Sequence, residues 1–588
     1  MLSVKEHRQY QVLAENAALL YQLRPSPTPQ HVNKRPAWAA NQDSGRFLSF
    51  DQELDLTSAL AFICGISDDP SHVVATCVEE IGGWRGEKKG IRAVVAINAN
   101  NPQSAIGTLT KVKNGLEAVF VQLSGAHQED DLFPEYPVLR AIADMCKHRI
   151  FSRIGSERQD AKYTKNGKQF LGTTLQCILD AISTTRRSFV GELKGIADRF
   201  ARQGRQILHH LKSLETCKEK NVVLTMMDVI RAVHKLIETT SFNTLLDTLT
   251  TTELAPTDRH RFTTQIAKLA QYQECTLLFL QMAKAQNIFQ QAEVHLVSLE
   301  PELFKPEMPF PPGCHITSCI NRCRASSGSK IKANTTEIAA KLQRQGKSNT
   351  AFKSTVSEIL KQSRVHAEIQ ILTHYERHPV PKKPRIICSS KDSCYLCNLF
   401  IRLRGDFYTP RTHGNIYHRW WLPPVSSFAT TRNRLNQELA AQIGRVTLDL
   451  MRPGSPGLML AKNENESTIF AFSELASTAD SPMEDTCTPS SSNKRDEADW
   501  QRRRYNTWAT TSPHYFPTTA TAAPPYLDTK VYSVRPQDSY DELPGFPAES
   551  TNWHRRDLFV SGTPEVIKEE GGFWAGVRKC WQFLTGQR

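Results

Sequence analysis

Two short motifs bring together residue types that can bind a metal ion and activate water. His366 is followed two positions later by Glu368, and Cys394 and Cys397 come after a further 25 residues. A catalytic zinc ion takes three protein ligands and keeps a fourth position open, and one imidazole with two thiolates meets that count. Zn²⁺ lowers the pKa of its water, and a carboxylate that is not a ligand can carry protons. The pattern therefore predicts metal-assisted hydrolysis.

The segments around these motifs predict the elements that hold them. Apolar residues repeat at helical spacing after His366, and a proline ends that pattern. The two cysteines are three residues apart, which on a helix places both sulfurs on one face near the N-terminus, where thiolates are favoured. The sequence predicts a helix over 365–378, a buried strand over 385–388, a helix that Ser393 caps and that ends near Gly405, and further strands over 407–408 and 416–417.

Longer stretches around the motifs resemble a known family. The sequences V-H-A-E-I-Q-I-L (365–372), S-C-Y-L-C-N-L-F (393–400) and T-H-G-N-I-Y-H-R-W (412–420) are similar to the OTT-type nucleic-acid deaminase-like family, in its fungal branch. That family is part of the zinc-dependent cytidine deaminase-like superfamily, whose signature is H-x-E followed by P-C-x-x-C. The resemblance covers about residues 330–430. One departure is Ser393, which stands where the superfamily commonly has proline.

The resemblance implies a function for each motif residue. His366, Cys394 and Cys397 would bind Zn²⁺, and Glu368 would be the general acid/base. The reaction would be hydrolytic deamination of cytosine or adenine, in nucleic acid or in nucleotides. A non-catalytic deaminase-like scaffold with a structural metal site is the alternative, although such a site has no need of a carboxylate that is not a ligand.

Further residues near the motifs leave alternatives open. His413 and Trp420 are candidates for a substrate pocket, with core packing an equal alternative for Trp420. Cys388 is the nearest candidate for a fourth ligand, although a cysteine in an apolar strand usually packs as a small hydrophobe. Alternation over 315–320 predicts a strand in which cysteines 314, 319 and 323 pack rather than bind metal. Of the two other H-x-E triplets, 127–129 lies in an acidic stretch with no cysteine pair in range. The triplet 374–376 lies about two turns further along the predicted helix and is rotated by roughly 80° from the helix start.

Composition predicts the partners and the compartment. The 588 residues carry a net charge of +13, and about +8 falls in residues 351–450, where 15 Lys and Arg face seven acidic residues. A basic surface attracts polyanions such as nucleic acid without selecting a base, although a generic basic surface is an equal interpretation. No secretory signal or membrane-spanning run is present in the sequence, and cysteine usage indicates a reducing compartment. We expect a cytoplasmic or nuclear protein that is not secreted.

The chain as a whole is predicted to be an α/β protein of several parts. The first part is an N-terminal arm (1–45). A mostly helical region (46–305) follows, and strand-like runs at 93–97 and 118–121 interrupt it. Next comes a zinc domain (310–455), for which the resemblance implies the cytidine deaminase-like central sheet flanked by helices. A disordered Ser/Thr/Pro-rich tail (470–565) and an amphipathic C-terminal helix (566–588) follow.

Two of these parts are candidate docking regions. The helical region and the C-terminal helix are candidates for binding a protein partner, and the C-terminal helix also for a membrane surface, with packing on the folded body an equal alternative for that helix. Basic residues of the helical region could form a nucleic-acid face, but a solvated helix surface is the favoured interpretation for them: Arg186, Arg187, Arg199, Arg202 and Arg205.

Overall fold

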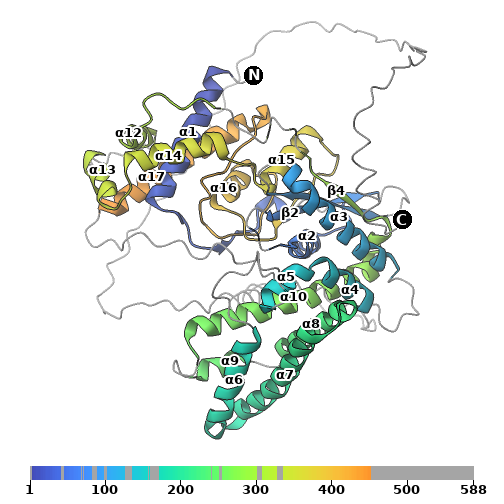
Figure 1. Cartoon of the computed structure of the whole chain (residues 1–588). Helices are drawn as coiled ribbons and strands as arrows, with labels where there is room; N and C mark the ends of the chain where they lie inside the picture. The colour runs from blue at the N-terminus through green and yellow to red at the C-terminus, as the bar shows by residue number, and fades with distance from the viewer. Residues whose placement is uncertain are drawn as a thin grey trace, which may run out of the picture. The chain divides into compact units, whose positions relative to one another are not determined.

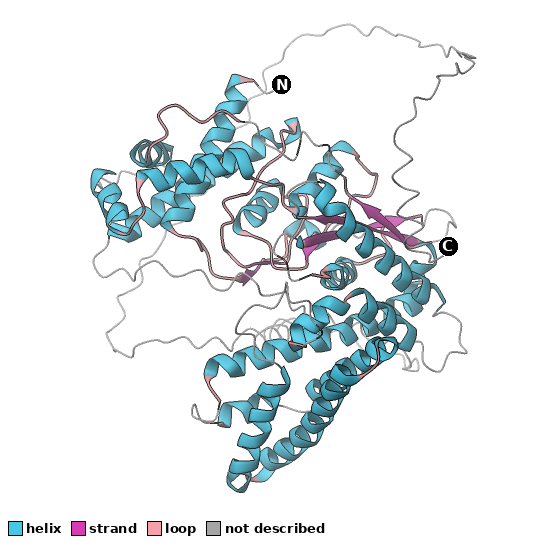
Figure 2. Cartoon of the chain, in the orientation of Figure 1, coloured by secondary structure: helices cyan, strands magenta, loops and turns pink. Residues whose placement is uncertain are grey.

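The structure, a computed structural model, describes residues 3–451 apart from short gaps, of which 126–134, 159–170 and 327–334 are the longest. Figure 2 shows that the described part is mostly helical, with a small mixed sheet. The predicted tail (470–565), the predicted C-terminal helix (566–588) and the triplet 127–129 lie outside the described residues. Among the described helices, none combines the length and apolar character needed to cross a membrane.

Four strands form the main sheet, in the order β4, β3, β2, β5. β2 (Val74–Ile81) and β3 (Gly90–Ile97) pair antiparallel along their whole length. β5 (Cys388–Ser389) adds antiparallel to the other side of β2, and β4 (Glu293–Leu296) lies parallel to β3. The strand predicted over 93–97 is therefore confirmed. A separate antiparallel pair joins β1 (His31–Val32) to β6 (Arg411–Thr412).

The sheet separates two hydrophobic cores, because successive side chains of a strand point to opposite faces. On β2, Val74 and Val78 belong to the first core, whereas Ala75 and Cys77 belong to the second. β3 alternates in the same way. Figure 1 shows α2 (Phe50–Cys64) and α15 (Ala367–Arg377) on opposite sides of β2, and both helices contact that strand.

The first core contains α2 and the long helices of the predicted helical region. α7 and α8 pack side by side, and α10 packs against both α8 and α4. The apolar residues that predicted helices at 193–214 and 266–280 fall on α7 and α10, and most of them are buried. The bounds are α3 (Pro102–Gly125), α4 (Glu135–Met145), α5 (Lys147–Ile154), α6 (Leu171–Thr185), α7 (Gly191–Thr216), α8 (Val222–Thr239), α9 (Phe242–Thr248) and α10 (Pro256–Gln286).

The second core surrounds α15 and contains the first and last described helices. α1 (Val4–Leu23), inside the segment predicted as an arm, packs against α17 (Ala429–Met451). Asn16 of α1 donates a hydrogen bond to the Asn436 carbonyl of α17 at 3.3 Å. The other helices of this core are α12 (Ile316–Ser326), α13 (Thr335–Arg344), α14 (Asn349–Gln362) and α16 (Tyr395–Arg404).

Four strand predictions are wrong. The run 118–121 lies within α3, and the residues 316–320 lie within α12 rather than in a strand. Short apolar runs fit a helix or a strand equally well, and here longer helical repeats decide the outcome. No strand forms over 416–417, and near 407–408 a single bridge joins Tyr408 to Ile386. The packing role of the three cysteines at 314, 319 and 323 is confirmed, because all are buried in the second core.

A buried ion pair fixes the chain just before β5. Glu53 of α2 accepts hydrogen bonds from the Arg385 backbone N–H at 2.7 Å and from its Nε at 2.6 Å. Both side chains are about 1% exposed. Burial raises the pKa of Glu53, while the Arg385 guanidinium opposes that change. The pair therefore attaches the segment leading into β5 to helix α2.

Removing one partner of this pair is expected to destabilise the fold strongly. Arg385→Met leaves the Glu53 carboxylate buried without its cation, and such changes cost about 3–5 kcal/mol of unfolding free energy. The matched control is Arg35→Met, because Arg35 pairs with Asp51 at 3.0 Å but both side chains are about half exposed. That exposed pair is worth about 1 kcal/mol or less. Urea denaturation of the two variants measures the difference, and equal losses would contradict a structural role for the buried pair.

Candidate metal centre

His366 stands at the start of α15, where the helix is fixed against the sheet. Its backbone is extended, and it is the N-cap residue of that helix. One turn later, the Gln370 side chain donates hydrogen bonds to the carbonyls of Ile97 at 2.7 Å and Val365 at 2.9 Å. Near the other end, the Tyr375 hydroxyl donates to Glu79 of β2 at 2.7 Å. These contacts fix the direction in which the imidazole of His366 leaves the helix.

The two cysteines stand at the start of α16. Cys394, not Ser393, is the N-cap residue, since its Sγ accepts a hydrogen bond from the Cys397 N–H at 3.3 Å. The prediction that Ser393 caps the helix is therefore wrong. The Ser393 hydroxyl instead donates to the Arg411 carbonyl at 2.8 Å, which attaches α16 to β6. The predicted helix end is confirmed at Gly405, which has a left-handed backbone conformation.

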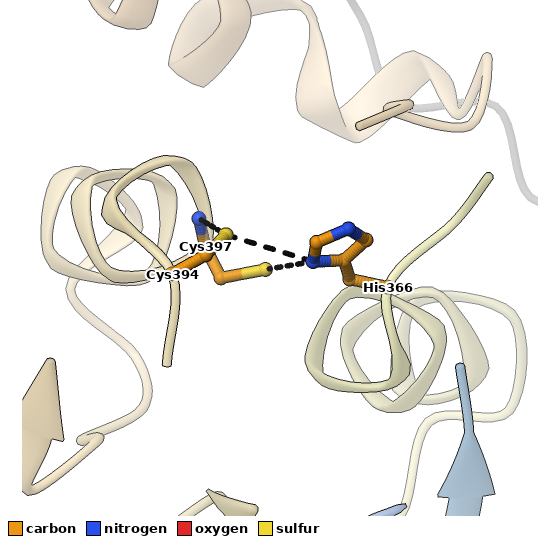
Figure 3. A group of neighbouring side chains, drawn as sticks. All are labelled: His366, Cys394 and Cys397. Atoms are coloured by element: carbon orange, nitrogen blue, oxygen red, sulfur yellow. Dashed lines mark hydrogen bonds between the residues drawn. The ribbon is translucent and has the colours of Figure 1, made fainter. Parts of the chain in front are cut away.

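The two helix starts face each other, and their side chains converge (Figure 3). The Sγ atoms of Cys394 and Cys397 lie 3.5 and 3.6 Å from Nδ1 of His366. One ligand atom from each residue can be chosen so that all lie within 4.8 Å of one another. In the described part of the chain, this is the one group of three or more His, Cys, Asp and Glu residues that meets this condition. The set could hold a single metal ion.

Glu368 lies beside this group. Its Oε2 is 3.5 Å from Cys397 Sγ, and its Oε1 accepts a hydrogen bond from the Ser389 hydroxyl of β5 at 3.0 Å. Burial raises the pKa of Glu368, and the neighbouring Cys394 raises it further. A buried carboxyl group held in this way can take up and release protons.

The protein environment shifts the pKa values of the two cysteine thiols in opposite directions. Burial raises the pKa of Cys397 well above its ordinary value. Burial also favours the neutral thiol of Cys394, but hydrogen bonding from Cys397 and the charge of His366 outweigh it and hold the pKa of Cys394 well below its ordinary value. Thiolates are the form that binds metal, so this helix start favours the ionised state of one ligand.

Trp420 contacts the site from its buried side. Its indole Nε1 donates a hydrogen bond to Cys397 Sγ at 3.3 Å, and its ring packs 6.2 Å from that of Phe400. The side chain is about 3% exposed and belongs to the second core. Hydrogen bonds to a ligating sulfur orient the ligand and tune its affinity for metal. Trp420 thus lies behind the ligands rather than at an open surface.

Trp420→Phe is expected to weaken metal binding about 10- to 100-fold. Phenylalanine keeps an aromatic ring but is smaller than tryptophan and lacks the indole nitrogen, so some packing and the hydrogen bond to Cys397 are lost. Trp421→Phe is the matched control, because Trp421 is equally buried and its indole nitrogen has no hydrogen-bond partner among the described residues. Competition with a chromophoric chelator measures both affinities. A Trp420 variant with the affinity of the Trp421 variant would show that the hydrogen bond has no influence.

The segment after α16 carries His413 and Tyr417, an aromatic residue that was not among the predicted site residues. The Tyr417 ring lies 6.0 Å from the His366 ring and 5.2 Å from the His413 ring. Tyr417 and His413 are both partly exposed. The two rings therefore lie between the ligand group and the surface. In the sequence, the feature that could have indicated Tyr417 as a site residue is an aromatic side chain two positions after Asn415.

Residues 25–33 of the N-terminal segment cross this loop. Gly414 has φ +72°, and a Cβ there would collide with the Thr28 carbonyl. The Ile416 N–H donates to the Pro25 carbonyl at 2.8 Å, and β1 pairs with β6. The segment predicted as an arm is therefore part of the structure that holds His413 and Tyr417.

The helical region also reaches the site. Arg149 of α5 is buried and donates hydrogen bonds to the Phe62 and Gly65 carbonyls at the end of α2. It also donates to the Ser390 carbonyl at 3.4 Å. Ser390 directly follows Ser389, the residue that holds Glu368. A single guanidinium thus links the end of α2, α5 and the loop that precedes α16.

Two alternatives from the sequence do not join the site. Cys388 bonds to the Ser58 hydroxyl at 3.4 Å in a separate small core, where burial raises its pKa to about 12. It is absent from the ligand group formed by the described residues. The His374 ring lies 5.0 Å from the His295 ring in a tilted arrangement, and Glu376 pairs with Arg404, two turns from the helix start.

Comparison with known proteins adds one match. A sequence model of the family described as OTT_1508-like deaminase matches residues 365–424. The matched segment runs from the start of α15 past β6, so it contains the three potential ligands, Glu368, His413 and Trp420. Neither the curated proteins nor the solved structures compared with the chain give a match. Residues 365–424 are thus similar to a deaminase family, which supports a hydrolytic deaminase.

Proposed function

We propose that the protein is a zinc-dependent hydrolytic deaminase of cytosine or adenine, in nucleic acid or nucleotides. One observation carries the proposal. One imidazole and two cysteine sulfurs converge within 4.8 Å, with the Glu368 carboxyl group 3.5 Å from one sulfur, inside a segment similar to a deaminase family. The OTT-type fungal branch and the cytidine deaminase-like superfamily are the assignment we propose for that segment.

The donor set fits zinc. Thiolate and imidazole ligands select Zn²⁺ over Mg²⁺ and Ca²⁺, which prefer oxygen. His366, Cys394 and Cys397 would hold the ion. When bound, it would act as a Lewis acid that lowers the pKa of water to about 7.

The protein's own groups would move the protons. Glu368 would accept a proton from the attacking water and deliver it to a ring nitrogen of the base, and a second proton transfer would release ammonia. The water oxygen forms a bond to the amino-bearing carbon, and the carbon–nitrogen bond to the amino group breaks. Ser389 would orient Glu368 through its 3.0 Å hydrogen bond. His413 and Tyr417 would line the approach to the site, and Trp420 would support Cys397 from behind.

A structural zinc in an inactive scaffold is less well supported by the geometry. A closed structural site takes four protein ligands, whereas the described residues bring three together. Glu368 also stays close to the ligand group without a structural need for it. The cysteines of the described residues are all free thiols, which agrees with our proposal of a cytoplasmic or nuclear location.

Metal analysis combined with an ammonia-release assay tests the proposal. The full chain is assayed with cytosine and adenine as nucleosides, as nucleotides, and within single-stranded DNA and RNA. We expect about one zinc ion per chain and ammonia from at least one of these substrates. Full zinc occupancy without ammonia from any of them would favour the scaffold, and absence of bound metal would contradict both alternatives.

A further inference from the structure

One face of α7 carries a row of exposed cations. Lys194, Arg202, Arg205 and Lys212 are all exposed, with His209 in line between the last two. Their spacings of eight, three and seven residues keep them on one side of the helix. The opposite side is apolar, and its buried residues pack into the first core: Ile196, Phe200, Ile207 and Leu214. We refer to Lys194, Arg202, Arg205 and Lys212 as the α7 cationic face.

The α7 cationic face is not balanced by nearby acids. Among the described residues, no acidic side chain pairs with any of its four cations. Asp198, which lies in the same row, is already paired with Arg186 at 2.9 Å. Residues 186–212 contain seven Lys and Arg residues but two acidic residues. An exposed arginine elsewhere in the protein does form an ion pair: Arg35 lies 3.0 Å from the Asp51 carboxylate.

This charge pattern does not stabilise helix α7. Like charges three or four residues apart, as at Arg202 and Arg205, destabilise a helix slightly, whereas alternating charges stabilise it. The burial of Ile196, Phe200, Ile207 and Leu214 already accounts for the packing of α7. Neither the packing of α7 nor its helix stability depends on these cations, so they are available to contact a polyanionic partner.

We propose that the α7 cationic face binds the phosphodiester backbone of nucleic acid. From Lys194 to Lys212 the helix rises about 27 Å, a length that about eight phosphates of one strand span at 3.4 Å each. Four long, flexible cations along that length can each neutralise a phosphate, and such contacts hold a strand without reading its sequence. The apolar side of α7 packs into the first core, whereas His366, Cys394 and Cys397 lie on the other side of the sheet in or beside the second, so binding here would hold substrate outside the proposed catalytic site.

The choice of nucleic acid over other polyanions rests on the proposed function, but the test does not require turnover. The full chain is titrated against fluorescein-labelled 20-nucleotide single-stranded DNA, the same sequence as RNA, and a 20-base-pair duplex, at several salt concentrations. The face variant carries Lys194→Gln, Arg202→Gln, Arg205→Gln and Lys212→Gln. With about 0.7 ions released per phosphate contact on a single strand, we expect the slope of log K against log salt to fall by about 3. We also expect at least about tenfold weaker binding at 100 mM salt.

The control variant removes the same charge from other surfaces. It carries Lys111→Gln, Lys284→Gln, Arg344→Gln and Lys353→Gln, all at exposed positions without an ion pair among the described residues. It should keep the slope of the wild type. An unchanged slope in the face variant, or an equal fall in the control, would overturn the proposal. Circular dichroism confirms that both variants fold. Binding lost with the face variant but no ammonia release from any substrate would count against the deaminase alone.

Discussion

Glu368→Gln is expected to lower the rate of ammonia release by about 10²- to 10⁴-fold while zinc stays bound. Glutamine keeps the size of the side chain and can still accept the hydrogen bond from Ser389, which is 3.0 Å long in the wild type. It cannot take up a proton from water and pass it on. Because Glu368 is not among the proposed ligands, the group of His366, Cys394 and Cys397 remains intact. The effect should therefore appear in kcat with little change in zinc content.

Glu376→Gln is the matched control for this prediction. Glu376 lies on the same helix, two turns further on, and belongs to the other described H-x-E triplet. It pairs with Arg404 and Lys383 rather than with the ligand group. We expect its variant to keep near wild-type turnover under the same assay. Retained activity in Glu368→Gln, at full zinc occupancy, would remove Glu368 from the mechanism.

Cys394→Ala is expected to weaken zinc binding by two orders of magnitude or more. Apparent zinc-binding free energies of four-ligand structural sites are about 10–16 kcal/mol, so one ligand accounts for roughly 3–4 kcal/mol. The Sγ of Cys394 also accepts the Cys397 N–H at the start of α16, so the substitution removes an N-cap as well. Loss of a cap costs about 1 kcal/mol. We therefore expect a lower melting temperature together with the loss of metal.

Cys388→Ala separates these effects from the general cost of losing a buried cysteine. Cys388 is buried but bonds to Ser58 outside the ligand group. Its variant should lose some stability through a small cavity and keep its metal. Zinc per chain by mass spectrometry and melting by circular dichroism measure both properties. Equal zinc content in the two variants would show that Cys394 is not a ligand.

The sequence predicted which residues converge because their determinants are local. His366 and the two cysteines stand at helix starts, and the helix periodicity after His366 and the stop at Gly405 were readable within about ten residues of each motif. The cap was misassigned because serine is a common N-cap residue, whereas here the thiol of Cys394 takes that position. Which of two adjacent polar residues caps a helix depends on the contact that Ser393 makes with Arg411.

The sheet beside the site could not be predicted in the same way. β5 is two residues long and pairs with β2, and residues 82–387 lie between the two strands in the chain. No local pattern encodes such a pairing, since it arises from burial on both faces of β2 and from the Arg385–Glu53 pair. The hydrogen bond from Trp420 to Cys397 and the position of Tyr417 depend on the same tertiary packing. The chemical groups of the candidate site could therefore be predicted from the sequence, whereas the residues that hold them in position depend on the tertiary fold.

X-ray absorption spectroscopy at the zinc edge of the purified full chain tests the central claim most directly. The account predicts one zinc ion per chain with two sulfur neighbours at about 2.3 Å and two nitrogen or oxygen neighbours at about 2.0–2.1 Å. The nitrogen would come from His366 and the sulfurs from Cys394 and Cys397. A protein without bound zinc, or a zinc ion surrounded by four sulfur atoms, would contradict it.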